Sequence, residues 1–389
     1  MRRGSDWLRR HALRAALALA AVCLAAPARA HGPAPAALEV LAVDDGGAPT
    51  LVRTNIGLAA ANGDGTYAYV CPSRWDENER ALAAASEDGR EVLVHSTGVA
   101  FLSRDAGCGF DSRTDEALYV VDAARWDGAF AIATEVVESG ETAVTRWDGD
   151  ASASLGAPGD VDGLLGGDAL FAAGHAPRAF VGRWDGAWTE LFGSDDETWS
   201  RVVPRAADAD GVWVLARDAD AAELWRVTTA GRARGPRHDV VHGPARLADR
   251  WLAIFDGVLH AFEGGAWEAL GAVDWTCLHA VGGHVYACTL PYMLELSDAP
   301  MPTGEPVFAM TQIGAPRACG DVEMARACGR EWSHFGGESG WTDTQPARSP
   351  TAPRGESGCS AAPARADAPW LGWLLLSATW IRARRRRRD

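Results

Sequence analysis

The feature that most constrains the fold is a short tryptophan-marked sequence that recurs along the middle of the chain. Arg-Trp-Asp occurs four times, with Gly after the last three copies, at residues 74–76, 125–127, 146–148 and 183–185. Asp-Gly between alternating apolar residues favours a type I′ turn, because both residues tolerate positive φ. The recurring sequence therefore predicts a series of β-hairpins, each marked by a tryptophan.

The distance between hairpins gives the size of the repeating unit. Phe180–Leu191 and Leu259–Leu270 share the longer pattern Gly-Ala-Trp-x-x-Leu. Steps of 37, 44 and 35 residues separate the predicted turns at positions 149, 186, 230 and 265. A unit of this length holds four short strands, which is the size of one β-propeller blade. We therefore predict an all-β fold, a β-propeller over residues 37–312, rather than a β-sandwich or a solenoid.

Seven units can be placed along this region, and six or eight blades are the alternative counts. We expect the blades at residues 50–76, 81–113, 125–158, 160–194, 199–239, 243–271 and 273–312. The first of these is incomplete, and residues 38–44 are free to complete the last blade. Closing the ring in this way would remove exposed strand edges. The tryptophans are expected to pack between blades, and a stacking platform for carbohydrate is their alternative role.

One hairpin of the second unit carries a further motif. Residues 103–110 have the pattern S-x-D-x-G-x-x-F, formed by Ser103, Asp105, Gly107 and Phe110. The segment resembles the Asp box of BNR-repeat propellers. The resemblance implies a structural role, in which the aspartate caps the hairpin backbone and the aromatic ring packs beneath it.

Sialidases are Asp-box propellers, so a carbohydrate-active enzyme, sialidase-like or another glycosidase, is the alternative function. A sialidase also needs clustered arginines, a tyrosine nucleophile and a carboxylic acid. None of the five tyrosines stands out as a nucleophile, and a fold does not imply a function. We therefore assign no catalytic residue and favour a protein that is not an enzyme.

The N-terminus has the features of a secretory signal peptide over residues 1–30. Five arginines precede an apolar stretch at 15–26, and Ala28-Arg29-Ala30 supplies small residues before an expected cut at His31. This order of basic, apolar and small residues is typical of export signals. Residues 31–36 then form a short leader. A transmembrane anchor is the alternative, although the apolar stretch is shorter than the roughly 20 residues of a span.

The C-terminus has three parts in a fixed order. A linker rich in Pro, Arg, Ser and Thr at 346–357 precedes a tail at 358–389. The tail contains Gly358-Cys359, an apolar stretch at 369–381 and an arginine cluster. This order resembles the MYXO-CTERM sorting signal of myxobacteria. The resemblance implies removal of the tail near Cys359 by the sorting machinery and delivery to the outer cell surface. An ordinary membrane anchor is the alternative.

Six cysteines remain in the body of the chain when those of the two end segments are set aside. An even number in an exported protein predicts disulfides. The two-residue turn Gly282-Gly283 places Cys277 opposite Cys288 on paired strands. Directly opposed residues of this kind lie within disulfide reach, so we predict a bond between these two cysteines.

The other two disulfides are expected from proximity in the sequence. Cys71 would pair with Cys108 and join two early units, and Cys319 would pair with Cys328. The last bond would fasten a short helix, about residues 321–333, in a Cys-containing helical segment at 313–345. A zinc site is the alternative for these cysteines, although no C-x₂-C spacing occurs.

The charge of the chain argues against nucleic acid as a partner. The formal net charge is −15 at pH 7, and both end segments are rich in arginine, so the body is more acidic still. A surface of this sign repels phosphate backbones. Contact with a membrane is expected only through the C-terminal tail.

Two Asp-rich loops hold the candidate metal ligands, and calcium is the metal that suits them. The candidates are Asp160, Asp162, Asp208 and Asp210. Neither loop completes an EF-hand pattern. A mature N-terminus at His31 is also a candidate copper ligand. No other cofactor is expected.

Together these features predict an exported protein of the outer cell surface, anchored or released after processing of its tail. We expect its propeller to act as a non-catalytic recognition or scaffold module for a protein or a glycan.

Overall fold

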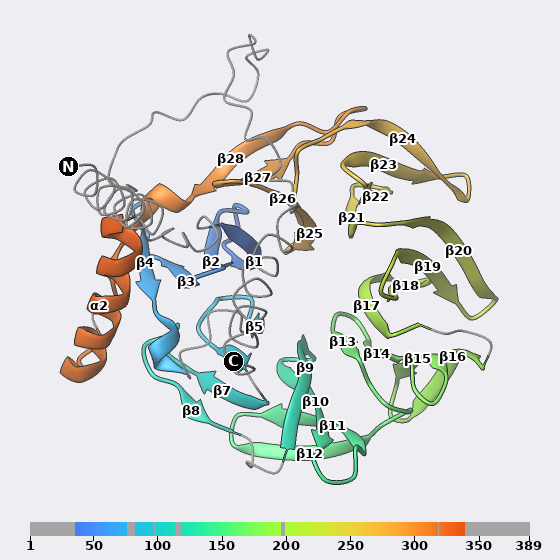
Figure 1. Cartoon of the computed structure of the whole chain (residues 1–389), viewed down its shortest axis with the longest axis horizontal. Coiled ribbons are helices and arrows are strands. Elements are labelled where there is room, and N and C mark those ends of the chain that lie inside the picture. The colour runs from blue at the N-terminus through green and yellow to red at the C-terminus, as the bar shows by residue number, and fades with distance from the viewer. Residues whose placement is uncertain are drawn as a thin grey trace, which may run out of the picture. The chain divides into compact units, whose positions relative to one another are not determined.

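The computed structural model of the protein describes residues 36–75, 82–96, 98–113, 118–195, 199–317 and 319–338. Their strands form seven sheets around a central channel, so the predicted seven-bladed β-propeller is confirmed (Figure 1). None of the described helices is long and apolar enough to span a membrane. The predicted signal peptide, the linker and the sorting tail with Cys359 lie outside the described residues, as does most of the leader.

Each blade is an antiparallel meander whose first strand lies nearest the channel. Blade 1 contains β1 (Ala37–Val43), β2 (Pro49–Thr54), β3 (Gly57–Ala61) and β4 (Tyr67–Val70), and blade 2 contains β5 (Leu82–Ala85), β6 (Val92–Ser96), β7 (Val99–Ser103) and β8 (Asp111–Ser112). Blade 3 contains β9 (Leu118–Trp126), β10 (Ala129–Val136), β11 (Thr142–Asp148) and β12 (Ala151–Gly156), and blade 4 contains β13 (Gly163–Leu165), β14 (Leu170–Gly174), β15 (Ala179–Trp184) and β16 (Trp188–Ser194).

The remaining blades follow the same order. Blade 5 contains β17 (Arg201–Asp208), β18 (Gly211–Arg217), β19 (Ala222–Thr228) and β20 (Gly231–His238), and blade 6 contains β21 (Val241–Leu247), β22 (Arg250–Phe255), β23 (Val258–Glu263) and β24 (Ala266–Ala272). Blade 7 contains β25 (Cys277–Val281), β26 (His284–Thr289), β27 (Tyr292–Leu296) and β28 (Gly304–Ala309).

Apolar side chains pack between neighbouring blades, and the tryptophans take part in this packing. Trp225 of blade 5 is fully buried in a cluster shared with Phe171 of blade 4. On the other face of blade 5, Trp213 is buried beside Trp251 of blade 6, with 5.9 Å between the ring centroids. Burial of one large apolar side chain contributes about 1.5–3 kcal/mol, so these contacts hold consecutive blades together.

The Arg-Trp-Asp sequences do not all form the same turn. Asp127-Gly128 is a two-residue turn with positive φ at both positions, 49° and 70°, as the sequence predicts. After the third copy, Asp148 itself pairs with Ala151, so the turn lies one residue later than expected. The first copy forms no hairpin, because a short 3₁₀ helix (η1, Pro72–Arg74) precedes the buried Trp75.

The predicted way of closing the ring is wrong. Residues 38–44 do not complete the last blade; residues 38–43 belong to β1, the innermost strand of blade 1, and Asp44 follows it. The side chain of Asp44 accepts hydrogen bonds from the N–H groups of Gly46 and Ala48, and this tight turn pairs β1 with β2. The fourth strand of blade 7 is supplied by β28 instead.

The chain returns to blade 1 after the last blade. A second 3₁₀ helix (η2, Met310–Gln312) leads into β29 (Ile313–Pro316), which pairs in parallel with β4. The helix α2 (Val322–Glu338) follows, and Asp321 accepts hydrogen bonds from the N–H groups of Glu323 and Met324 at its start. The segment predicted to be helical therefore begins with a strand at the outer edge of blade 1.

Cys277 and Cys288 are bonded and directly opposed, in agreement with the predicted pairing. The other two predicted pairings are wrong, because the disulfides join Cys71 to Cys328 and Cys108 to Cys319. The helical rise from residue 322 to 328 is about 9 Å, which carries Cys328 away from its sequence neighbour. Strand β29 meanwhile brings the C-terminal segment beside blade 1, where Cys71 directly follows β4.

The long-range disulfide is expected to contribute more stability than the short one. The Cys71–Cys328 bond spans 257 residues and the Cys277–Cys288 bond spans 11. The Cys108–Cys319 bond, which spans 211 residues, stays in place in both variants, so the first bond closes a further loop of 257 − 211 = 46 residues. Loop-closure entropy then predicts a loss of about 4 kcal/mol in unfolding free energy when both cysteines of the first bond are replaced by serine, and about 3 kcal/mol for the second. Equilibrium denaturation of the two double variants measures the difference. Equal losses would contradict this account.

Candidate functional site in the central channel

A cavity of about 720 Å³ opens into the central channel. Blades 1, 4, 5, 6 and 7 contribute lining residues, many of them from innermost strands, between Leu38 in β1 and Val281 in β25. Cavities of roughly 300–1,000 Å³ suit small molecules. This channel cavity is the candidate functional site.

Arginine dominates the charged residues of the channel cavity. Three acidic residues line it, Glu39, Asp168 and Asp208, against five arginines: Arg53, Arg183, Arg205, Arg217 and Arg246. Glu39 already pairs with Arg53 at 2.9 Å, and Asp208 pairs with Arg226. The channel cavity is therefore electropositive, although the protein carries a formal net charge of −15.

Arg205 illustrates how the fold gathers this charge. It lies on β17, the innermost strand of blade 5, at the point where the register with β18 shifts. Such a bulge re-aims a side chain relative to the regular alternation. Burial lowers the pKa of Arg205, the charge of Asp122 raises it, and repulsion from Arg201 and Arg217 lowers it again. The guanidinium remains protonated. The Arg205 side chain is exposed to the channel, and the charges of Asp122 and Glu39 partly offset those of the neighbouring arginines.

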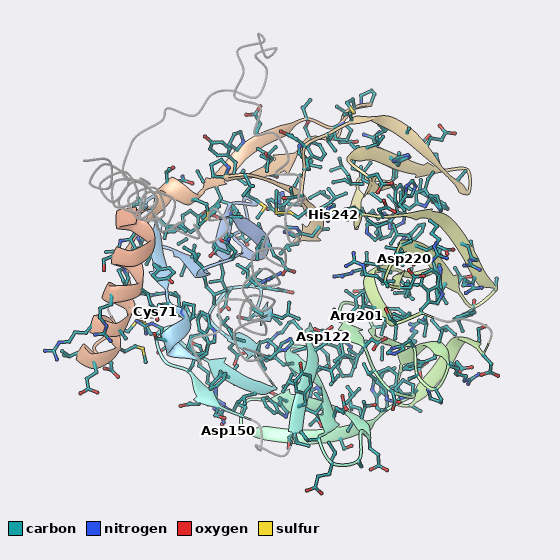
Figure 2. The ribbon with its side chains drawn as sticks, in the orientation of Figure 1. Cys71, Asp122, Asp150, Arg201, Asp220 and His242 are labelled. Carbon is teal, nitrogen blue, oxygen red and sulfur yellow. A yellow bond between two sulfur atoms is a disulfide. The ribbon has the colours of Figure 1, made fainter. Side chains whose placement is uncertain are left out.

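His242 lies beside these arginines on β21, the innermost strand of blade 6. Burial lowers the pKa of His242, and repulsion from Arg217 and Arg205 lowers it further. The imidazole is therefore neutral at pH 7. Figure 2 shows Asp122, Arg201 and His242 around the channel, on blades 3, 5 and 6.

Side-chain acceptors tie the innermost strand of one blade to the backbone of the next. Asp122 of blade 3 accepts a hydrogen bond of 2.9 Å from the N–H of Leu164 in blade 4. Asp162, just before β13, accepts one of 2.7 Å from the N–H of Val202 in blade 5. Because buried N–H groups need partners, these contacts fix the strands that form the channel wall.

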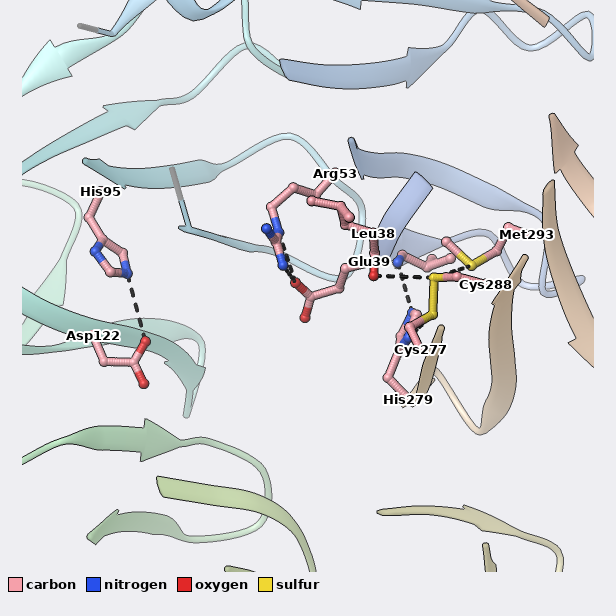
Figure 3. Close-up of polar contacts among 10 residues, drawn as sticks. Leu38, Glu39, Arg53, His95, Asp122, Cys277, His279, Cys288 and Met293 are labelled. Atoms are coloured by element: carbon pink, nitrogen blue, oxygen red, sulfur yellow. Dashed lines mark hydrogen bonds and ion pairs between the residues drawn. A yellow bond between two sulfur atoms is a disulfide. The ribbon is translucent and has the colours of Figure 1, made fainter. Parts of the chain in front are cut away.

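The same kind of contact joins the last blade to the first. Nε2 of His279 in β25 accepts a hydrogen bond of 2.8 Å from the N–H of Val40 in β1. Figure 3 shows His279 beside the Cys277–Cys288 disulfide, with the Glu39–Arg53 pair close by. An acceptor Nε2 requires a neutral ring whose proton is on Nδ1.

Two of the four calcium candidates, Asp162 and Asp208, serve as side-chain hydrogen-bond acceptors, whereas Asp160 and Asp210 donate backbone N–H groups. Asp162 contacts His175 at 2.7 Å in addition to Val202, and its burial raises the pKa of the carboxyl above the usual range. Asp208 accepts from the N–H groups of Asp210 and Gly211. Within the described ranges, no group of three His, Cys, Asp or Glu residues is placed to hold a metal ion.

Residues 103–110 form the hairpin between β7 and β8. Oγ of Ser103 accepts a hydrogen bond from the N–H of Gly107, and Oδ1 of Asp105 accepts one from the N–H of Gly109, each at 2.8 Å. Burial raises the pKa of Asp105, but its hydrogen bonds lower it by more, so the carboxyl is more acidic than usual. The ring of Phe110 packs edge-on against Trp75 at 5.2 Å.

The cavity arginines leave only a weak signal in the sequence. Arg201 and Arg205 interrupt an otherwise apolar stretch that begins blade 5. Charged residues in an innermost strand indicate side chains that face a channel. The signal becomes clear only once the blade order is known, because Arg183 and Arg246 come from other blades.

No family model matches the sequence, and no curated protein matches it. Similar solved structures include an ancestral GH74 enzyme, with a TM-score of 0.48 and 10% identity over 70% of this chain and 46% of that chain. The extracellular domain of a proposed one-component system from B. thetaiotaomicron has a TM-score of 0.43 and 10% identity, over 68% and 40% of the two chains. The N-terminal domain of Nup159 has a TM-score of 0.40 and 10% identity, over 67% and 87%.

The chain thus spans less than half of the first two of these structures. Similarity at these scores assigns no activity to the protein.

His279 should make the stability of the ring depend on pH. Burial lowers its pKa from 6.5 to about 4, with opposing smaller effects of Glu39 and Arg53. The unfolded chain therefore takes up a proton first, and stability is lost as the pH falls from 6.5 towards 4, by at most about 1.4 kcal/mol per pH unit. Urea denaturation of the wild type and His279→Gln between pH 7.5 and 4.5 tests this. Identical pH profiles would exclude His279 as the source.

Proposed function

We propose that this protein is an exported propeller of the cell surface that recognises a ligand in its channel cavity without catalysing a reaction. The observation that carries the proposal is a cavity of small-molecule size, walled by five blades and rich in arginine. Its wall is held by hydrogen bonds between innermost strands, such as Asp122 to Leu164 and His279 to Val40. A fixed wall favours binding because little side-chain entropy is lost on association.

Export is supported by the three disulfides, which are typical of proteins that mature in oxidising compartments. The sequence features of both ends add to this, with a signal peptide before His31 and a MYXO-CTERM-like tail from Gly358. We propose that the tail directs the protein to the outer surface and is removed near Cys359.

We propose a structural role for the Asp-box-like hairpin. Ser103 and Asp105 satisfy backbone N–H groups of their own turn, and Phe110 packs on Trp75. These contacts are internal to blades 1 and 2 and lie away from the lining of the channel cavity. They support a stabilising function for the motif and no part in ligand binding.

A glycosidase on the same fold is the second candidate, and one cavity residue favours it. Asp168 lines the channel cavity without a hydrogen bond or ion pair to any described residue. Glycosidases generally need two carboxyl groups, and the other two of this cavity, Glu39 and Asp208, are engaged by arginines. This engagement makes recognition the better supported function.

Export and processing predict the mass of the mature protein. Intact mass spectrometry of the protein released from its native envelope should give a chain that starts at His31 and ends near Cys359. The mass should also be lower by six hydrogens, because three disulfides form. A chain that retains Arg384–Arg388 would indicate an ordinary membrane anchor and contradict tail removal.

Recognition and hydrolysis predict different results on an array of glycans and peptides. For recognition, the purified mature protein should retain at least one bound compound unchanged, and Asp168→Asn should bind it with the same affinity within about twofold. Mass spectrometry of the recovered compound detects turnover. Hydrolysis that is abolished in Asp168→Asn would establish the glycosidase instead.

A further inference from the structure

The guanidinium groups of four channel-cavity arginines make no direct hydrogen bond or ion pair in the part of the chain that the structure describes. These arginines are exposed to solvent and come from three consecutive blades: Arg183 of β15, Arg205 of β17, Arg217 of β18 and Arg246 of β21. Many arginines elsewhere in the propeller do pair with carboxylates. Arg234, for example, binds Glu223 through two hydrogen bonds of 2.6 and 2.8 Å. In the channel cavity, by contrast, only Arg53 of the five arginines is paired in this way with a described residue.

The unpaired arginines repel one another. Arg201 and Arg217 face each other in the register of β17 and β18, and both lower the pKa of Arg205, against the opposing effects of Asp122 and Glu39. Burial lowers the pKa of His242 most, and Arg217 and Arg205 lower it further because they disfavour another positive charge. Like charges gathered at one cavity destabilise the empty site even where water reaches them. An anion between them would remove that repulsion.

The geometry of the site also indicates what kind of anion fits. A guanidinium presents parallel N–H donors that match carboxylate, phosphate and sulfate oxygens. Four arginines from three blades offer more donors than a single acidic group can use. Apolar side chains, including Phe171, Leu215 and Trp251, line the same cavity and would contact a carbon skeleton.

We propose that the channel cavity binds a small organic anion with at least two acidic groups, held by Arg205 and Arg217 together with Arg183 and Arg246. This inference rests on the proposed recognition function, because it names the chemical class of the ligand. Acidic sugars and other polycarboxylates share this chemistry, as do organic phosphates and sulfates.

Calorimetric titration at low ionic strength tests the inference with four probes: citrate, glucose 1,6-bisphosphate, inorganic phosphate and acetate. Citrate or the bisphosphate should bind, inorganic phosphate more weakly, and acetate least, because only the first two combine several acidic groups with a carbon skeleton. Whichever of the first two binds more tightly identifies the preferred acidic group. The affinity should fall as salt is added, because salt screens the arginines.

Two double variants with the same change in charge distinguish the effect of the cavity arginines on binding from the effect of the protein's net charge. Arg205→Gln with Arg217→Gln should weaken binding of the best probe by at least about tenfold. Arg90→Gln with Arg326→Gln is the matched control, since both residues are exposed and lie outside the channel cavity. The control should bind within about twofold of the wild type. Arg205→Lys keeps the charge but not the donor fork, and should give an intermediate affinity.

Thermal unfolding checks that the double variants are folded. Arg205→Gln with Arg217→Gln should be at least as stable as the wild type, because the repulsion between the two arginines is lost. Failure of every probe to bind at millimolar concentration would overturn the inference, as would equal binding by both double variants. The recognition function is tested separately by the array. A neutral glycan that binds there, and that binds equally well to Arg205→Gln with Arg217→Gln, would leave recognition intact and exclude an anionic ligand.

Discussion

Blade 7 meets blade 1 through hydrogen bonds and a shared apolar cluster, and every other blade depends on this contact. His279 accepts from the N–H of Val40, and the hydroxyl of Tyr286 donates to the carbonyl of Gly47 at 2.6 Å. Side chains from both blades, including the fully buried Phe308, form one core cluster. A blade can bury both of its faces only between two neighbours, so an open ring would expose apolar surface at both ends.

The local features of the sequence predict the fold well, and its long-range contacts poorly. The Asp127-Gly128 turn and the opposed Cys277 and Cys288 follow from residues close in sequence. The pairing of Cys71 with Cys328, 257 residues away, depends on β29 returning to the outer edge of blade 1. Strand β29 is only four residues long and is not marked by a hairpin turn, so the sequence does not reveal it. Proximity in sequence therefore suggests the wrong disulfide partner for Cys328.

The candidate site is even harder to predict from the sequence than the long-range disulfides. Each arginine of the channel cavity lies in an ordinary strand, and only the ring brings residues of blades 4, 5 and 6 to one space. The chain is acidic overall, whereas arginines dominate the charged residues that line the channel cavity. Sequence patterns identify how a blade is built, whereas the chemistry at the centre arises from the order and number of the blades.

The Cys71–Cys328 bond also changes what a single backbone cleavage does to the molecule. A protease that cuts any surface loop between these residues leaves the two fragments covalently joined, because the disulfide bridges the cut. The second bond, from Cys108 to Cys319, gives most of the ring the same protection. A propeller nicked in this way would keep all seven blades in one covalent unit, and its fragments would separate only after reduction.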